Sequence, residues 1–372
     1  MSYDGRYSPA LTPFSVPFMF RSLIVLLAFA AFTAAADNKP QPPKDAKVAF
    51  LKLLDRPKVA LDAKVAESKS GVDLFEERLT FASEKQGEAT ERVPVLIVRP
   101  KHEKGDPVKR PVMILLHGTG GNKDGMRPYL DAFAKKGFVA VAIDARYHGD
   151  RADGKKGSER YVGAIADAWT AARAGKPHEH PWFYDTCWDL WRLIDYLETR
   201  PDVDASRIGM LGISMGGIQT WLAASVDDRV AVAVPLIAVQ SFRTMLDNDL
   251  WQGRANTVLA AHKVAANDLG EPGVNAKVCR EMWAKLLPGI VDDFDCPNLI
   301  RLFAGRQLFI GNGELDPNCP LVGAKLAFAA AEEAFKSSKG KLVIDVSKGV
   351  AHKVTEEQKA AAIEFCAAAL KK

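Results

Sequence analysis

A serine flanked by glycines stands where a buried strand would meet a helix. Residues 212–216 read Gly-Ile-Ser-Met-Gly and overlap the end of the apolar run 208–213. Glycines two positions before and after the serine allow a sharp turn that exposes the hydroxyl, because a side chain there would strike a neighbouring segment. A serine hydroxyl is a poor nucleophile at neutral pH, so Ser214 needs a base and an acid from elsewhere in the chain. A glycine-rich turn without chemistry is the alternative.

The base is expected to be a histidine that follows the serine in the chain. The sequence holds seven histidines, of which only His262 and His352 come after Ser214. His262 falls in a long segment between strands, whereas His352 follows the last apolar run, 342–346, and precedes the final helical segment. We therefore expect His352 to take the proton from Ser214. A surface loop histidine is the alternative.

An acidic turn follows the apolar run 308–310 and contains both Glu314 and Asp316. Asp316 is the preferred acid, because Gly313 permits a turn and Pro317 stops the strand from continuing. It would hold the imidazole in the required tautomer and stabilise the imidazolium. Glu314 is one alternative, and a solvated turn without a catalytic role is another.

A glycine-rich turn follows an earlier apolar run. Residues 117–121 read His-Gly-Thr-Gly-Gly directly after 112–116. Such a turn lets backbone N–H groups point into a site, so we expect the N–H groups of Thr119 and Met215 to form an oxyanion hole. His117 is expected to be structural. A phosphate-binding loop is disfavoured, since no Lys-Ser or Lys-Thr pair follows the glycines.

Alternating strands and helices must position these groups. The apolar runs typical of strands covered on both faces are 112–116, 139–143, 208–213, 230–237, 308–310 and 342–346. Segments with helical character are 129–136, 182–197, 321–335 and 355–370. This alternation predicts the α/β class, a mostly parallel central sheet with helices on both faces and sites at the strand ends. Before it, 78–82 and 93–98 are expected to form paired edge strands, and 48–65 an outer helix.

Two segments interrupt the alternation within the domain expected over residues 78–372. They span about 146–180 and 240–301. Insertions at this edge of a sheet commonly shape the substrate pocket, so we expect them to form a cap or lid. Trp251 and Trp283 lie in the second insertion. Core packing is the favoured role for both, and stacking on sugar is the alternative.

Charge and cysteine content exclude several classes of protein. The net charge is only +4 and no basic tract stands out, so nucleic acid is not an expected partner. The five cysteines are odd in number and form no Cys-x-x-Cys or Cys/His cluster, so we expect no metal site. Buried free thiols are at least as well favoured as disulfides.

The Asp and Arg side chains of residues 144–151 are interpreted as an internal network, with contact to an anionic or sugar-bearing substrate as the alternative.

Residues 1–36 have the pattern of an export signal. Arg21 supplies a positive flank, 23–32 is an unbroken apolar stretch, and 34–36 are small residues suited to cleavage. A linker and helical extension is expected over 37–77. The apolar stretch is short for crossing a bilayer, so we expect a periplasmic or secreted protein with no stable membrane insertion after cleavage. An uncleaved membrane anchor is the alternative.

With these motifs in this order, the chain resembles the α/β-hydrolase superfamily over about residues 93–370. Within it, residues 189–217 and 313–316 are similar to the dienelactone hydrolase, acetyl xylan esterase and prolyl oligopeptidase-type catalytic domains. The resemblance implies an acyl-enzyme mechanism without cofactor or metal. Dienelactone hydrolases use a cysteine nucleophile where this chain has Ser214, and prolyl oligopeptidases carry an upstream propeller for which there is no room here.

The sequence therefore predicts an exported serine hydrolase that cleaves carboxylic esters. Its substrate would be a small molecule or a carbohydrate bearing small acyl groups. A serine peptidase acting on short peptides is the first alternative, and an acidic cap residue that captures a free N-terminus would favour it. A non-catalytic binding protein of the same fold is the second alternative, which the presence of Ser214, Asp316 and His352 disfavours.

Overall fold

A computed structural model describes residues 46–101 and 109–371 of the chain. The expected signal peptide, residues 1–36, lies outside the described residues, as does the start of the expected linker. No helix of the described residues is long and apolar enough to cross a membrane. Export and signal cleavage therefore stay predictions from the sequence.

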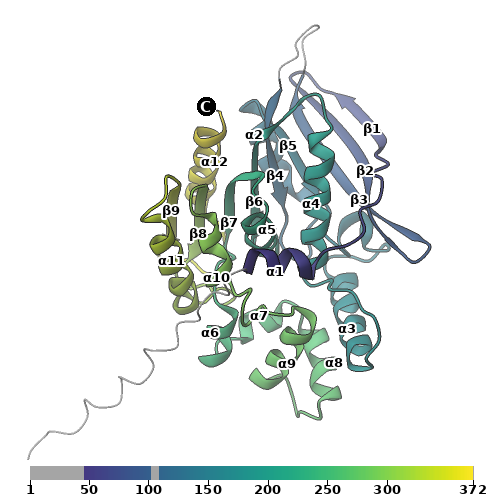
Figure 1. Cartoon of the computed structure of the whole chain (residues 1–372), viewed down its shortest axis with the longest axis vertical. Helices are drawn as coiled ribbons and strands as arrows, with labels where there is room; N and C mark the ends of the chain where they lie inside the picture. Colours follow the sequence, from purple (N-terminus) through teal and green to yellow (C-terminus); the bar gives the residue numbers. More distant parts are fainter. Residues whose placement is uncertain (1–45, 102–108, 372) are drawn as a thin grey trace, which may run out of the picture. The chain divides into compact units, whose positions relative to one another are not determined.

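A nine-stranded sheet runs through the described chain (Figure 1). Its strands, in spatial order, are β1 (Lys64–Ser70), β2 (Leu74–Gln86), β3 (Ala89–Pro100), β5 (Val139–Ile143), β4 (Arg110–Leu116), β6 (Val203–Ile213), β7 (Val230–Leu236), β8 (Gln307–Gly313) and β9 (Lys341–Ser347). The first three strands pair antiparallel, as does β3 with β5. Every later pair is parallel, so loops after β4, β6, β8 and β9 emerge at one edge.

Helices cover both faces of the sheet. One face carries α2 (Arg127–Lys135) and α12 (Glu356–Leu370). The other carries α4 (Tyr184–Glu198), α5 (Met215–Val226) and α11 (Leu321–Phe335), with α1 (Ala46–Leu53) and α10 (Cys296–Ile300) packed against α5. Short 3-10 turns occur at Asp124–Met126, Gly149–Arg151 and Arg301–Phe303.

The strand sequences explain why both faces are covered. In β4, Val112 and Ile114 enter the core beneath α4 and α5, whereas Met113 and Leu115 enter the core beneath α2 and α12. Successive side chains of a strand point to opposite faces, so a strand covered on both sides is apolar throughout. The continuous apolar runs in the sequence predicted these strands for that reason.

Two helical segments leave the sheet between strands. The first contains α3 (Glu159–Arg173), and the second contains α6 (Phe242–Asp247), α7 (Gln252–Asn256), α8 (Leu259–Asp268) and α9 (Ala276–Leu286). Figure 1 shows these five helices grouped at one end of the sheet. The two segments pack on each other, and the Trp169 indole N–H of α3 donates to Asp268 Oδ2 of α8 at 2.9 Å. Their role as a cap over the substrate stays a prediction.

The helix expected over residues 48–65 is wrong in its second half. α1 ends at Leu53, and residues 64–70 form the edge strand β1. Pro57 follows shortly after the helix, and proline disfavours helical backbone in the residue before it. All seven residues of β1 are exposed, so its sequence lacks the alternation of apolar and polar residues that would predict a strand.

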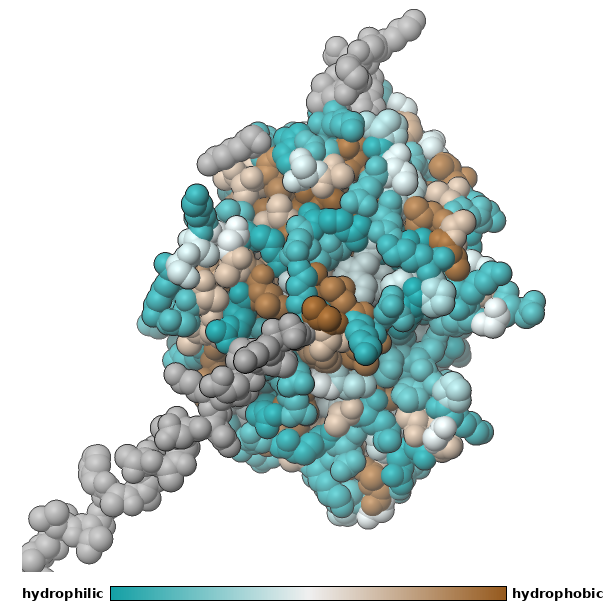
Figure 2. Space-filling view, in the orientation of Figure 1, coloured by the Kyte–Doolittle hydropathy of each residue, from teal (hydrophilic) through white to brown (hydrophobic). Residues whose placement is uncertain are grey.

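The exposure of side chains can be compared with what their residue types predict. Hydrophilic side chains cover most of the face in Figure 2, and the hydrophobic ones visible there lie in small separate patches. All five cysteines are buried and unpaired, which confirms the interpretation as free thiols. Trp283 is fully buried among Trp182, Phe242 and His262, as expected for a core residue, whereas Trp251 is half-buried.

Candidate active site

Ser214 occupies the sharp turn between β6 and α5. Its backbone has φ +54° and ψ −111°, a left-handed conformation that side-chain-bearing residues rarely adopt. Such strain costs roughly 1–3 kcal/mol and is typical of functional positions. The flanking glycines are required for close approach, since a Cβ at Gly212 would overlap the Gly216 carbonyl and one at Gly216 would overlap that of Leu116. The turn therefore has the geometry that the glycine spacing predicts.

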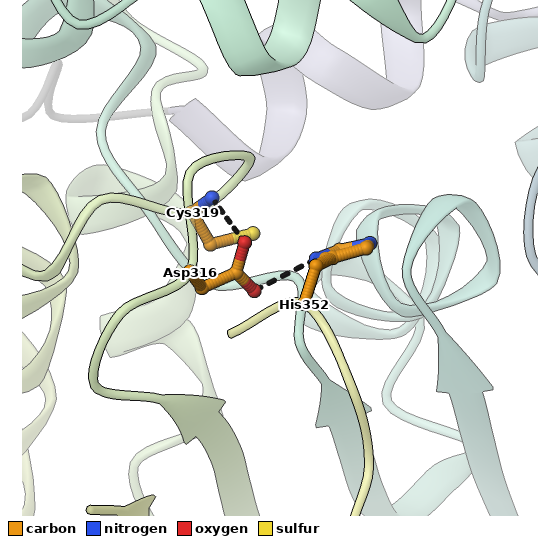
Figure 3. Close-up of side chains that lie close together, drawn as sticks. All are labelled: Asp316, Cys319 and His352. Atoms are coloured by element: carbon orange, nitrogen blue, oxygen red, sulfur yellow. Dashed lines mark hydrogen bonds and ion pairs between the residues drawn. The ribbon is translucent and has the colours of Figure 1, made fainter. Parts of the chain in front are cut away.

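The structure joins Ser214, His352 and Asp316 in one chain of hydrogen bonds. His352 lies in the loop between β9 and α12, and its Nε2 is 2.8 Å from Ser214 Oγ. Its Nδ1 is 2.7 Å from Asp316 Oδ2 (Figure 3). With a neutral imidazole, the Ser214 hydroxyl donates to Nε2 and the Nδ1–H donates to the carboxylate. A base oriented by an acid and touching a hydroxyl is an arrangement suited to nucleophilic catalysis.

The Asp316 carboxylate is buried and held on both oxygens. Oδ1 accepts the backbone N–H of Asn318 at 2.8 Å and that of Cys319 at 3.0 Å. Oδ2 faces His352. The loop after β8 thus fixes the carboxylate through its own backbone, which leaves one oxygen to orient the imidazole.

Glu314 does not reach the histidine. Its Oε2 accepts the Gly349 N–H at 2.7 Å and so holds the neighbouring loop. Gly313 serves a purpose that the sequence did not suggest. Its φ is not positive, but a Cβ there would overlap the carbonyls of Val350 and Ala351, so the glycine permits two loops to approach.

The glycine-rich loop after β4 lies against the nucleophile. A Cβ at Gly118 would lie 3.6 Å from the Ser214 Cβ. The N–H of Thr119 has no acceptor among the described residues. Met215 is the first residue of α5, where N–H groups lack intrahelical partners and the helix dipole is positive. Convergence of these two N–H groups on one oxygen stays a prediction.

His117 holds the loop and does not reach Ser214. Its Nδ1–H donates to the Gly118 carbonyl at 2.8 Å, and its Nε2 accepts the Ala145 N–H at 3.2 Å. Burial lowers the pKa of His117, which keeps the ring neutral. The ring of His148 lies 5.1 Å away, and burial lowers the pKa of His148 to about 4. These contacts support the structural interpretation of His117.

Cys319 lies beside the acid and was not singled out from the sequence. Potential ligand atoms of Asp316, Cys319 and His352 lie within 4.8 Å of one another (Figure 3). The thiol, however, donates to the Ile237 carbonyl at 3.2 Å, and burial raises its pKa well above the usual value. A neutral thiol is a poor metal ligand, and both Asp316 oxygens already accept hydrogen bonds. The group is therefore better suited to proton transfer than to metal binding.

The arginines after β5 belong to an internal ion-pair network. Asp189 Oδ2 accepts from Arg146 Nε and from Arg151 Nη1, each at 2.8 Å. Arg146 also pairs with Glu84, and Arg151 with Glu91. Burial alone would raise the pKa of Asp189, but the two guanidinium groups outweigh it and hold the pKa well below its usual value. The favoured interpretation of this loop as an internal network is confirmed.

Solved proteins of known name share the fold of this chain. Two solved acetyl xylan esterases share it. The enzyme from Paenibacillus sp. R4 superposes with a TM-score of 0.61 and 20% identity, covering 89% of this chain and 96% of its own. The enzyme from Thermoanaerobacterium sp. JW/SL YS485 also gives 0.61, with 21% identity over 88% and 94% of the two chains. The chain has the α/β-hydrolase fold, as the sequence predicted.

The central region of the chain is also similar in sequence to known proteins. The model of the dienelactone hydrolase family matches residues 93–257. YtaP of Bacillus subtilis (strain 168), whose name assigns it to the hydrolases, is 31% identical over 159 residues, or 39% of this chain and 48% of YtaP. The chain spans about half the length of the curated relatives it matches. Its central region is similar to the dienelactone hydrolase family.

Proposed function

We propose that this protein is a serine hydrolase that cleaves carboxylic esters of small acyl groups, including acyl groups carried by carbohydrate. The observation that carries the proposal is the hydrogen-bonded series of Ser214, His352 and Asp316. The match to the dienelactone hydrolase family and the fold shared with acetyl xylan esterases support the hydrolase class. Carbohydrate as the carrier of the ester is suggested by the names of those esterases.

The first half of the reaction forms an acyl-enzyme. Ser214 Oγ attacks the ester carbonyl carbon while His352 Nε2 accepts the hydroxyl proton. Asp316 keeps the Nδ1–H in place and stabilises the imidazolium that results. The carbonyl C–O bond to the alcohol then breaks, and the alcohol leaves with the proton from Nε2.

The second half releases the acid. Water gives a proton to His352 Nε2 and attacks the acyl carbon, and the bond to Ser214 Oγ breaks as the serine regains its proton. In both halves the carbonyl oxygen becomes negatively charged. The N–H groups of Thr119 and Met215 would stabilise that charge, and loss of one such donor typically raises the barrier by about 2.7–4 kcal/mol.

The first experiment compares p-nitrophenyl acetate, butyrate and octanoate as substrates for the wild type and Ser214→Ala. We expect turnover that falls with acyl length and drops by roughly 10⁴-fold or more in the variant. Ser225→Ala is the matched control, because Ser225 is buried in α5, the helix that follows Ser214, and its hydroxyl donates to the Leu222 carbonyl. Equal rates for wild type and Ser214→Ala would refute the mechanism, and absence of wild-type turnover on every ester would refute the proposed function.

We also propose export, on the pattern of residues 1–36 alone. Cleavage before Asp37 would shorten the chain by 36 residues. The intact mass of the protein recovered from outside the cytoplasm tests this proposal. An unshortened mass would favour the alternative of a retained anchor.

A further inference from the structure

The central sheet ends in two edge strands that differ in how they are protected. β1 forms one edge of the sheet and β9 forms the other (Figure 1). The open side of an edge strand presents unpaired N–H and C=O groups to which another strand can pair, so proteins commonly protect edges with charges and bulges. The sequence and register of each edge strand therefore indicate whether a further strand can join the sheet there.

β1 carries both kinds of protection. Three of its seven residues are charged, namely Lys64, Glu67 and Lys69, and all seven are exposed. Its register with β2 shifts between Val65 and Glu67, and such an irregularity bends an edge strand. Pairing of another strand with β1 is therefore disfavoured.

β9 has neither kind of protection. It reads Lys-Leu-Val-Ile-Asp-Val-Ser and pairs with β8 over all seven residues without a shift in register. Six of the seven residues are half-buried, because helices cover both faces of the strand while no described strand pairs with its outer side. The only charged residues are Lys341 and Asp345, with Leu, Val and Ile between them. β9 is thus a regular, mostly apolar edge of the kind that can accept a further strand.

The backbone groups of alternate residues of β9 face the open side. The Ser347 carbonyl accepts the Glu314 N–H at 3.0 Å, which places the backbone of Ser347 on the side of β8. Backbone groups point alternately to the two sides of a strand, so those of Leu342, Ile344 and Val346 point away from β8. The described residues provide no hydrogen-bond partner for them. The open side therefore presents three donors and three acceptors in an unbroken row.

The side chains of β9 complement a second copy of the same strand. Antiparallel pairing about a two-fold axis at Val343 puts Lys341 of each copy opposite Asp345 of the other. Leu342 then lies opposite Ile344, and both residues direct their backbone groups to the open side. An axis at Asp345 would instead oppose two carboxylates, which is unfavourable, and an axis at Ile344 would oppose Asp345 to Val343. Charge therefore selects one register for the pair.

The two charged side chains are available for this contact. Lys341 lies on the face of β9 that α12 covers, with Nζ 5.5 Å from the centroid of the Phe365 ring. Asp345 lies on the same face, because it is four positions further along the strand. Neither side chain forms an ion pair with a described residue.

The helix on the other face of β9 exposes apolar side chains. α11 packs on β9, and its Val322 and Leu326 are 47% and 51% exposed. Because the two residues are four positions apart, they lie on the same side of the helix. Contact with another apolar surface would remove them from water, which is favourable.

We propose that β9 is the interface of a homodimer, in which the β9 strands of two copies pair antiparallel and join the two sheets into one. The two-fold axis is normal to the sheet and keeps α11 of both copies on the same face, where Val322 and Leu326 add apolar contact. Association stops at two copies, because each copy uses its one unprotected edge. Since the paired strands run in opposite directions, the loops that carry His352 point away from each other, and neither copy covers the proposed active site of the other.

Sedimentation of the purified protein tests the dimer and its register. We expect the mass to rise from one to two chains between about 0.1 and 100 µM and no further, because association depends on concentration. Lys341→Glu or Asp345→Lys alone would oppose like charges and should weaken the dimer at least tenfold. The double variant Lys341→Glu/Asp345→Lys restores opposite charges and should recover most of the wild-type affinity. Each variant is compared at unchanged thermal unfolding.

Lys69→Glu is the matched control, because Lys69 is an exposed lysine of the other edge strand. It should leave the dimer unchanged. Amide hydrogen exchange locates the interface: the N–H groups of Leu342, Ile344 and Val346 should exchange more slowly in the wild type than in Lys341→Glu at the same high concentration. A wild type that stays monomeric, or that grows beyond two copies, would overturn the inference. So would a double variant that dimerises no better than the single ones, or equal exchange at these three amides.

Discussion

At the scale of single residues, the choice between two acids is decided by which carboxylate touches the imidazole. Asp316→Asn should lower kcat roughly 10⁴-fold, because an amide cannot hold His352 in the tautomer that accepts a proton at Nε2. Glu314→Gln should change kcat by less than about twofold, since Glu314 contacts only the Gly349 N–H. Ester hydrolysis by the two variants, each checked for unchanged thermal unfolding, makes the comparison. Inactive Glu314→Gln beside active Asp316→Asn would reverse the assignment.

The residues of the site differ in how far the sequence alone could identify them. Ser214, Asp316 and His352 each follow an apolar strand, and few residue types can serve as nucleophile, acid or base, so type and order were enough to predict that the three side chains meet. Cys319 had no such signal. Its place beside Asp316 and His352 is set by the fold of the loop after β8, which residue type does not report.

At the scale of elements, the packing of α8 on α9 depends on a neutral histidine. His262 Nε2 accepts the Trp283 indole N–H at 2.9 Å, and burial lowers the pKa of His262 to about 4. In an unfolded chain the pKa of a histidine is near 6.5. Between about pH 6.5 and 4, His262 is therefore protonated in the unfolded state and neutral in the native state. The free energy of unfolding should therefore fall as the pH is lowered through this window.

Replacing His262 isolates its share of this pH dependence. His262→Gln should remove up to about 3 kcal/mol of the decrease in unfolding free energy between pH 7 and pH 4. Denaturant unfolding at several pH values measures it. His178→Gln is the control, because His178 is only half-buried and its Nδ1 bonds a backbone carbonyl. Parallel pH profiles for wild type and His262→Gln would contradict the prediction.

The sequence predicted best those strands and helices whose pattern of apolar residues follows from which of their faces are buried. Strands β4 to β8 contain apolar runs because both faces are covered, and α12 begins at a Thr355 cap, whose side chain accepts the Gln358 N–H. β1 was missed because it is an exposed edge strand whose side chains contribute nothing to a core. β1 pairs with β2 through backbone hydrogen bonds, which do not require particular residue types.

At the scale of the whole molecule, the fold does not depend on disulfide bonds, because all five cysteines are free thiols. All five are buried, and burial raises the pKa of each, so the reactive thiolate is scarce. We expect an aromatic disulfide reagent to modify none of them in the native protein and all five after unfolding. Thermal unfolding should be the same with and without a reductant. A reactive thiol in the native state, or a loss of stability on reduction, would contradict the prediction.

The helices α3 and α6 to α9 leave the sheet between strands that hold the reacting groups. Ser214, Asp316 and His352 are set by the ends of β6, β8 and β9, whereas α3 and α6 to α9 form no part of the sheet. The proposed cap and the proposed catalytic groups are thus encoded in separate stretches of the chain. Under the proposed function, a change in the length or charge of the helical stretches would alter the substrates and leave the reaction itself unchanged.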